Sequence, residues 1–166
     1  MAVQFGQSFF LNLFYKLRFV SLSLVTILDC SLLIIHYYLF RMLRTVLLVG
    51  IGGFLGSVSR FLAEQGLHRY FDTVFPIGTM TVNIVGSFII GIVYAVAERG
   101  NLVSPEMRMF LAVGFCGGFT TFSSFAFDNL NLLKDSGFLY LSLYVAGSVF
   151  LGLLAAYFGT QIHKLF

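Results

Sequence analysis

Long apolar segments dominate the chain from Met42 onward. Four such segments occur, at about residues 44–66, 77–97, 107–133 and 138–162. A bilayer hydrocarbon core about 30 Å thick needs about 20 apolar residues per helix, so each segment is long enough to cross it. Because lipid offers the backbone no hydrogen-bond partner, each segment is expected to be a helix. The sequence therefore predicts an all-α integral membrane protein with four transmembrane helices.

The composition excludes an ordinary soluble domain. Hydrophobic residues make up 58% of the chain and charged residues only 10%, whereas soluble domains carry about 25% charged residues. Too few polar side chains remain to cover a water-facing surface, so lipid or a partner subunit must cover most of it. The net charge of +3 is spread over loops and termini, which argues against nucleic acid as a partner. We expect a multi-pass protein of the cell membrane.

Residues 1–41 pose a separate question. They contain "FVSLSLVTILDCSLLIIHYYLF", which is long enough to span but carries Asp29 and His36 within it. No small-residue cleavage site follows, which argues against a cleaved signal peptide, while a fifth helix remains an alternative. Because "RMLRTVLLVGIGG" looks like a natural start at Met42, we predict that residues 1–41 are an extension outside a functional domain at 42–166.

The basic residues in the short loops bear on orientation. The side that holds Met42 carries Arg44, Arg99, Arg108 and Lys164, and the opposite side carries Arg69 and Lys134. This bias places Met42 in the cytoplasm. The margin is small, so insertion in both orientations stays open.

The first span combines small residues with a charge. Gly52, Gly56 and Ser59 recur at intervals of three and four residues, which predicts a face for close helix packing. Arg60 lies deep in the span, where its charge must be paired, hydrated or extended to the interface. Glu64 follows one turn later and is the expected partner of Arg60.

Polar side chains also interrupt the second and fourth spans. Asn83 is flanked by valine and isoleucine, and its amide offers two N–H donors for bridging helices or lining a water-filled cavity. In the fourth span, Tyr140, Tyr144 and Ser148 repeat every four residues and form a polar stripe. Tyrosine is common at membrane interfaces, but Ser148 lies too deep for that explanation.

The third span contains "GFCGGFTTFSSF" at residues 114–125. Gly117 and Gly118, followed by Thr120 and Thr121, weaken helix propensity in the middle of the membrane, which predicts a helix break near Gly117. Unpaired backbone at that depth is tolerated only where it lines a cavity or is buried in protein. Beyond the break, Phe122 and Phe125 are three residues apart and share a helix face.

Other function classes find less support. No Ser-His-Asp set, phosphate-binding loop or metal-spaced cluster lies in the spans, so we do not expect an enzyme. Cys30 and Cys116 are far apart and belong to no C-x-x-C pair. A proton-coupled small exporter would need a carboxylate deep in the membrane, and Glu64 is poorly placed for this. A non-transporting assembly subunit would leave the broken helix and Asn83 unexplained.

Three motifs together resemble one family. "GGFLGSVSRF" at 52–61, "GTMTVNIVGSFIIG" at 78–91 and "GFCGGFTTFSSF" occur in the order found in the small dual-topology fluoride channels called Fluc or CrcB. With the fourth span, the resemblance covers about residues 42–166. It implies a passive fluoride-selective channel that exports fluoride to relieve toxicity. It also implies an antiparallel homodimer with two pores.

The resemblance further implies roles for individual residues. Asn83 would be the pore asparagine, and Phe122 and Phe125 would be the aromatic residues that line the pore. A hydroxyl track would be formed by Ser123, Ser124, Tyr144 and Ser148. The backbone carbonyls of Gly117 and Thr120 would hold a structural sodium ion at the dimer interface, and Arg60 would match the family's first-helix arginine. Two departures occur. Asp128 stands where relatives often carry Glu, and Gly152 stands where some members continue the hydroxyl track.

Overall fold

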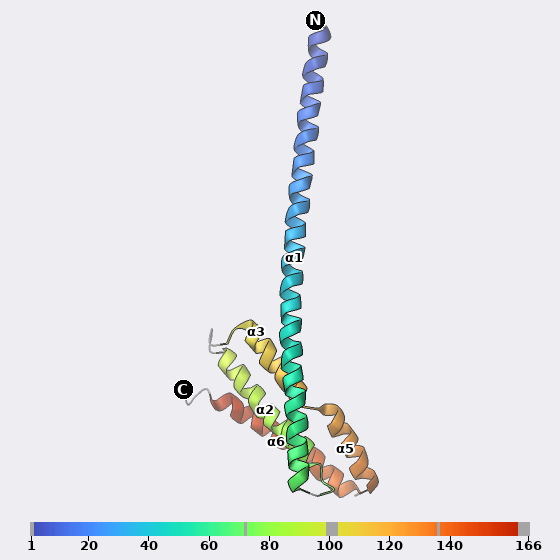
Figure 1. Cartoon of the computed structure of the whole chain (residues 1–166), viewed down its shortest axis with the longest axis vertical. Helices are drawn as coiled ribbons and strands as arrows, with labels where there is room; N and C mark the ends of the chain where they lie inside the picture. The colour runs from blue at the N-terminus through green and yellow to red at the C-terminus, as the bar shows by residue number, and fades with distance from the viewer. Residues whose placement is uncertain (1, 72, 99–102, 136, 163–166) are drawn as a thin grey trace. The chain divides into compact units, whose positions relative to one another are not determined.

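The computed structural model describes residues 2–71, 73–98, 103–135 and 137–162, with side chains from Ser31 onward. Every regular element in these residues is helical (Figure 1). In chain order the elements are α1 (Ala2–Tyr70), α2 (Ile77–Glu98), α3 (Pro105–Arg108), the π-helix η1 (Met109–Cys116), α4 (Gly117–Phe119), α5 (Phe122–Asp135) and α6 (Phe138–Gln161).

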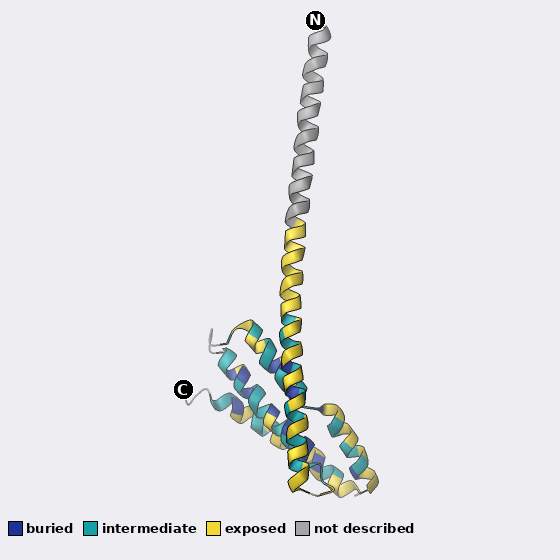
Figure 2. Cartoon of the chain, in the orientation of Figure 1, coloured by how far each residue is buried: buried dark blue, intermediate teal, exposed yellow. Residues whose placement is uncertain are grey.

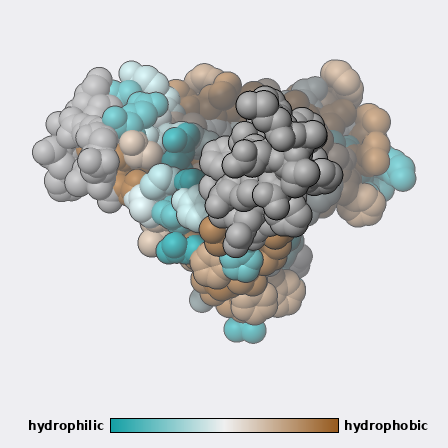
Figure 3. All heavy atoms as spheres, turned by 90° about the horizontal axis from the view of Figure 1, so that it is seen from above, coloured by the Kyte–Doolittle hydropathy of each residue, from teal (hydrophilic) through white to brown (hydrophobic). Residues whose placement is uncertain are grey.

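Four helical stretches among the described residues are long and apolar enough to cross a membrane. They are Ser31–Tyr70, Ile77–Glu98, Pro105–Asp135 and Phe138–Gln161. Large hydrophobic side chains such as Leu47, Phe54 and Leu153 are exposed along them, and Figure 2 shows many exposed positions on these helices. Hydrophobic residues form much of the described surface seen in Figure 3. The predicted all-α membrane architecture with four spans is confirmed.

The chain divides into two compact units, residues 1–44 and residues 45–166. Residues 2–41 are helical, but they continue α1 and do not form a helix of their own. The first span was predicted to begin at about Arg44, and no helix boundary occurs there. The prediction that residues 1–41 lie outside the functional domain stays a prediction.

Glycines set the close helix contacts within residues 45–166. A Cβ atom added to Gly52 of α1 would lie 3.0 Å from the Cα of Gly114 in η1, and one added to Gly91 of α2 would lie 3.1 Å from the Cα of Gly159 in α6. Such distances leave no room for a side chain, so the backbones pack directly on each other. The predicted small-residue face of the first span is confirmed at Gly52.

The third span is broken as predicted, within the stretch of Gly117, Gly118, Thr120 and Thr121 but after the two glycines. α4 runs from Gly117 through Phe119, and Thr120 then adopts an extended conformation with φ −86° and ψ 156°. Gly118 is helical because it packs on α1, where an added Cβ would meet the carbonyl oxygen of Gly53. The weak helix propensity of glycine, about 1 kcal/mol per residue, is overcome by this packing. The break lies at Thr120 and Thr121, before α5 resumes the helix.

Candidate functional site

Thr121 begins the second half of the broken span. Its Oγ1 atom accepts a hydrogen bond from the Ser124 backbone N–H at 3.2 Å, which makes Thr121 the N-cap of α5. Its hydroxyl also lies 3.1 Å from Oγ of Ser124 and 3.2 Å from Oγ of Ser123. The hydroxyls of Ser123 and Ser124 therefore belong to the cap of α5.

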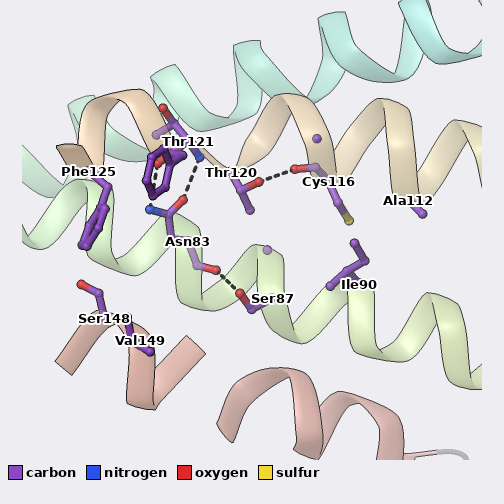
Figure 4. A pocket seen from close by; sticks show the side chains of 13 residues that line it. Asn83, Ser87, Ile90, Ala112, Cys116, Thr120, Thr121, Phe125, Ser148 and Val149 are labelled. Carbon is purple, nitrogen blue, oxygen red and sulfur yellow. Dashed lines mark hydrogen bonds between the residues drawn. The ribbon is translucent and has the colours of Figure 1, made fainter. Parts of the chain in front are cut away.

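Asn83 of α2 holds the extended backbone at the break (Figure 4). Its Nδ2 atom donates to the Thr121 carbonyl oxygen at 3.1 Å, and its Oδ1 atom accepts from the Thr121 N–H at 2.8 Å. Backbone groups in the membrane need partners, and this amide supplies both of them. Because an Asn amide carries two N–H donors, one N–H of Asn83 remains for another acceptor.

A groove of about 420 Å³ opens beside this contact. It is formed by α2, the third span on both sides of the break, and α6. Its lining residues are Asn83, Gly86, Ser87, Ile90, Ala112, Cys116, Gly117, Thr120, Thr121, Phe122, Phe125, Ser148 and Val149. No charged side chain of the described residues is among them.

The groove contains four of the predicted pore residues: Asn83, Phe122, Phe125 and Ser148. Oγ of Ser148 is buried and has no hydrogen-bond partner among the described residues, so its hydroxyl is available to a ligand. Figure 4 shows it on α6, directed toward the ring of Phe125. The proposed contacts of these side chains with an ion stay predictions.

Aromatic rings form a continuous row from the groove toward the loop before α2. The centroids of Phe122 and Phe125 lie 5.9 Å apart, and those of Phe125 and Tyr144 lie 5.2 Å apart. Phe75 meets Tyr144 edge-on at 5.5 Å. Phe122 is 81% exposed, whereas Tyr144 is fully buried. The prediction that Phe122 and Phe125 share a helix face is confirmed.

Tyr144 lies outside the lining of the groove. Its hydroxyl donates to Oδ2 of Asp128 at 3.2 Å. This hydroxyl is already paired, unlike that of Ser148. The predicted hydroxyl track is thus divided, with Ser148 in the groove and Tyr144 behind the ring of Phe125.

The expected ion pair between Arg60 and Glu64 is wrong. Nε of Arg60 donates to the Gly118 carbonyl oxygen at 3.3 Å, and Oε1 of Glu64 is buried without a hydrogen-bond partner among the described residues. The close approach of α1 to α4 at Gly118 brings that carbonyl within reach of Arg60. A contact between helices therefore replaces the contact along the helix that sequence spacing suggested.

Two carbonyl oxygens at the break lose their usual helical donors. In an α-helix the N–H of residue i+4 bonds to the carbonyl of residue i. The N–H of Thr121, which would serve Gly117, donates to Asn83, and the N–H of Ser124, which would serve Thr120, donates to the Thr121 hydroxyl. Among the described residues, the carbonyls of Gly117 and Thr120 are thus left without these partners and can accept from, or coordinate, another group.

Sequence reasoning placed Thr121 only in the weak helix stretch, and it gave none of Thr121, Cys116 and Ser87 a role in this site. Thr121 holds the contact with Asn83 and caps α5, whereas Cys116 and Ser87 line the groove. A threonine just before a new helix is a usual N-cap signal and could have identified Thr121. Cys116 and Ser87 have no such signal, because the helix rotation that turns them toward the groove is set by packing.

The fold and the groove define a small four-span membrane protein with a mainly apolar groove beside a broken helix, in which several side chains can form hydrogen bonds and none of the described lining residues is charged. The chain belongs to the CrcB family. The family described as "CrcB-like protein, Camphor Resistance (CrcB)" matches residues 47–160, which include every helix that forms the groove.

Curated relatives extend this similarity over most of their own length. A protein of Chlorobium phaeobacteroides (strain BS1) is 48% identical over 120 residues, which is 72% of this chain and 93% of the relative. A protein of Flavobacterium psychrophilum is 42% identical over 74% of this chain and 98% of the relative. One from Campylobacter jejuni (strain 81-176) is 42% identical over 74% of this chain and all of the relative. Each is named fluoride-specific ion channel FluC.

Proposed function

We propose that the chain conducts fluoride passively across the cell membrane along the groove at the helix break. The observation that carries this proposal is the unused hydrogen-bond donor capacity of Asn83 and Ser148 in a groove whose described lining residues include no charged side chain. Membership of the CrcB family supports fluoride as the ion. The chain is a transport protein in this account, and we assign it no enzymatic activity.

The groove offers the contacts that a small anion needs. Fluoride is strongly hydrated, so a pore must replace its water with hydrogen-bond donors, which Asn83 and Ser148 provide. Aromatic rings carry an electropositive edge, so the rings of Phe122 and Phe125 favour an anion that meets them edge-on. Because hydrogen fluoride enters cells from acidic surroundings and dissociates inside, passive outflow of the anion would relieve fluoride toxicity.

A second copy of the chain, in the opposite orientation, would close the groove. Phe122 is 81% exposed although it lies within a membrane-spanning segment beside the break. Gly117 is also exposed, and an added Cβ there would meet no atom of the described residues within 4 Å. This part of the chain thus exposes both Phe122 and Gly117. We place the interface of an antiparallel homodimer over it.

We further propose a structural sodium ion at this interface. Oxygen ligands suit a hard cation, and the carbonyls of Gly117 and Thr120 have lost their usual helical donors to Asn83 and Thr121. These carbonyls would hold the ion together with their counterparts in the second copy. When bound, the ion supplies positive potential that favours an anion in the nearby groove.

Fluoride efflux from liposomes tests the proposed function. Purified protein is reconstituted with internal fluoride, and an ion-selective electrode follows efflux with a potassium ionophore balancing charge. Efflux without a proton gradient is expected of a channel. Efflux that requires a proton gradient, or transport of cationic drugs, would identify an exporter, and no transport would identify an assembly subunit.

A further inference from the structure

Ser87 lies in the groove one helical turn after Asn83. Both residues line the groove from α2, and the Ser87 hydroxyl donates to the Asn83 carbonyl oxygen at 2.7 Å (Figure 4). The Ser87 side chain thus adds a hydroxyl to the groove on the same helix face as the Asn83 amide. The proposed contacts of fluoride with Asn83 and Ser148 do not involve the Ser87 hydroxyl.

On α6, the position next to the Ser87 hydroxyl is a glycine. Gly152 follows Ser148 by one turn on α6, and a Cβ atom added to Gly152 would lie 3.7 Å from Oγ of Ser87. The Ser87 hydroxyl would therefore contact the side chain of any larger residue at position 152 of α6. α6 therefore supplies a hydrogen-bond donor at Ser148 but none one turn later, at Gly152. Next to Gly152, the donor is the Ser87 hydroxyl of α2.

The hydrogen bond that holds the Ser87 hydroxyl can be released at little cost. In the helical ladder of α2, the Asn83 carbonyl also accepts from the backbone N–H of Ser87. The hydroxyl bond is a second bond to the same acceptor, so rotation of the hydroxyl leaves no buried carbonyl unpaired. An anion is a stronger acceptor than a carbonyl that is already bonded.

We propose that Ser87 is a further donor on the conduction path, beside Asn83 and Ser148. Its hydroxyl turns from the Asn83 carbonyl to the passing fluoride and replaces the hydroxyl that α6 lacks at Gly152. This inference rests on the proposed function, because it presupposes that fluoride crosses along the groove.

Removal and relocation of the hydroxyl test this role. Ser87→Ala is expected to lower the fluoride efflux rate about tenfold, as hydrogen bonds to charged groups are among the stronger ones. Adding Gly152→Ser to this variant places a hydroxyl on the facing helix and is expected to restore most of the rate. The matched control is Ser142→Ala on α6, whose hydroxyl also bonds to a carbonyl one turn earlier but does not line the groove.

The outcomes separate this inference from the proposed function. If the unaltered chain conducts and Asn83→Asp does not, then efflux by Ser87→Ala at the unaltered rate overturns the role of Ser87 alone. Failure of Gly152→Ser to restore a reduced rate also overturns it. Absence of fluoride transport by the unaltered chain refutes the proposed function itself. If Ser87→Ala does not assemble, Ser87→Cys, a weaker donor of similar size, must show a reduced rate for the role to stand.

Discussion

Asn83 pairs with both backbone hydrogen-bonding groups of Thr121, through Nδ2 at 3.1 Å to the carbonyl and Oδ1 at 2.8 Å from the N–H. One side chain of α2 thus stabilises the break in the third span and still keeps one N–H for the groove. Support of the break and provision of a donor therefore depend on the same amide.

Replacement of the Asn83 amide should stop conduction. In Asn83→Asp, the carboxylate cannot donate to the Thr121 carbonyl, and its negative charge repels an anion. We expect the fluoride efflux rate to fall on the order of a hundredfold or more. The unpaired carbonyl should lower the free energy of unfolding by about 1–3 kcal/mol. Asn131→Asp, the same change on α5 outside the lining of the groove, is the control, and equal rates for the two variants would refute the role of Asn83.

The ring of Phe122 should matter for conduction but little for folding. Because this side chain is 81% exposed, Phe122→Ile should leave assembly intact, as measured by size-exclusion chromatography. Loss of the ring edge should lower fluoride efflux about threefold to tenfold. Phe127→Ile provides a matched control on the same helix, since Phe127 is 63% exposed and does not line the groove. An unchanged fluoride efflux rate in Phe122→Ile would show that the Phe122 ring has no role in conduction.

Gly118 should tolerate no side chain. A Cβ atom there would overlap the carbonyl oxygen of Gly53, so Gly118→Ala must separate α1 from α4. Overpacking of this kind costs about 1–3 kcal/mol of unfolding free energy, measurable by thermal unfolding in detergent followed by circular dichroism. Gly66→Ala is the control, because an added Cβ at Gly66 meets no atom of the part of the chain that the structure describes within 4 Å. Equal midpoints for the two variants would contradict the close contact.

Sequence length and spacing predicted the spans and the shared face of Phe122 and Phe125, because both depend on residues within a single segment. The position of the break depends on a contact between helices. Gly117 and Gly118 have low helix propensity, yet the packing of Gly118 on Gly53 keeps them helical. The partner of Arg60 was likewise misassigned, since spacing along one helix cannot reveal a carbonyl on another.

Residues 1–41 should be dispensable for conduction. The compact unit that contains the groove begins at Thr45, and the family match begins at residue 47. A chain that starts at Met42 is therefore expected to reach the efflux rate per protein of the full chain in the same liposomes. A truncated chain that assembles but does not conduct would show that the extension takes part in function.

The central claim is that fluoride crosses along the groove beside the helix break. Val149 lines this groove from α6 but supplies no proposed donor, whereas Val145 lies one turn earlier, outside the lining. Both side chains are exposed at 36% or more, so tryptophan can be accommodated at either position. Fluoride efflux from liposomes should fall to the protein-free rate in Val149→Trp and stay near the unaltered rate in Val145→Trp. Unaltered efflux in an assembled Val149→Trp variant would contradict passage through the groove.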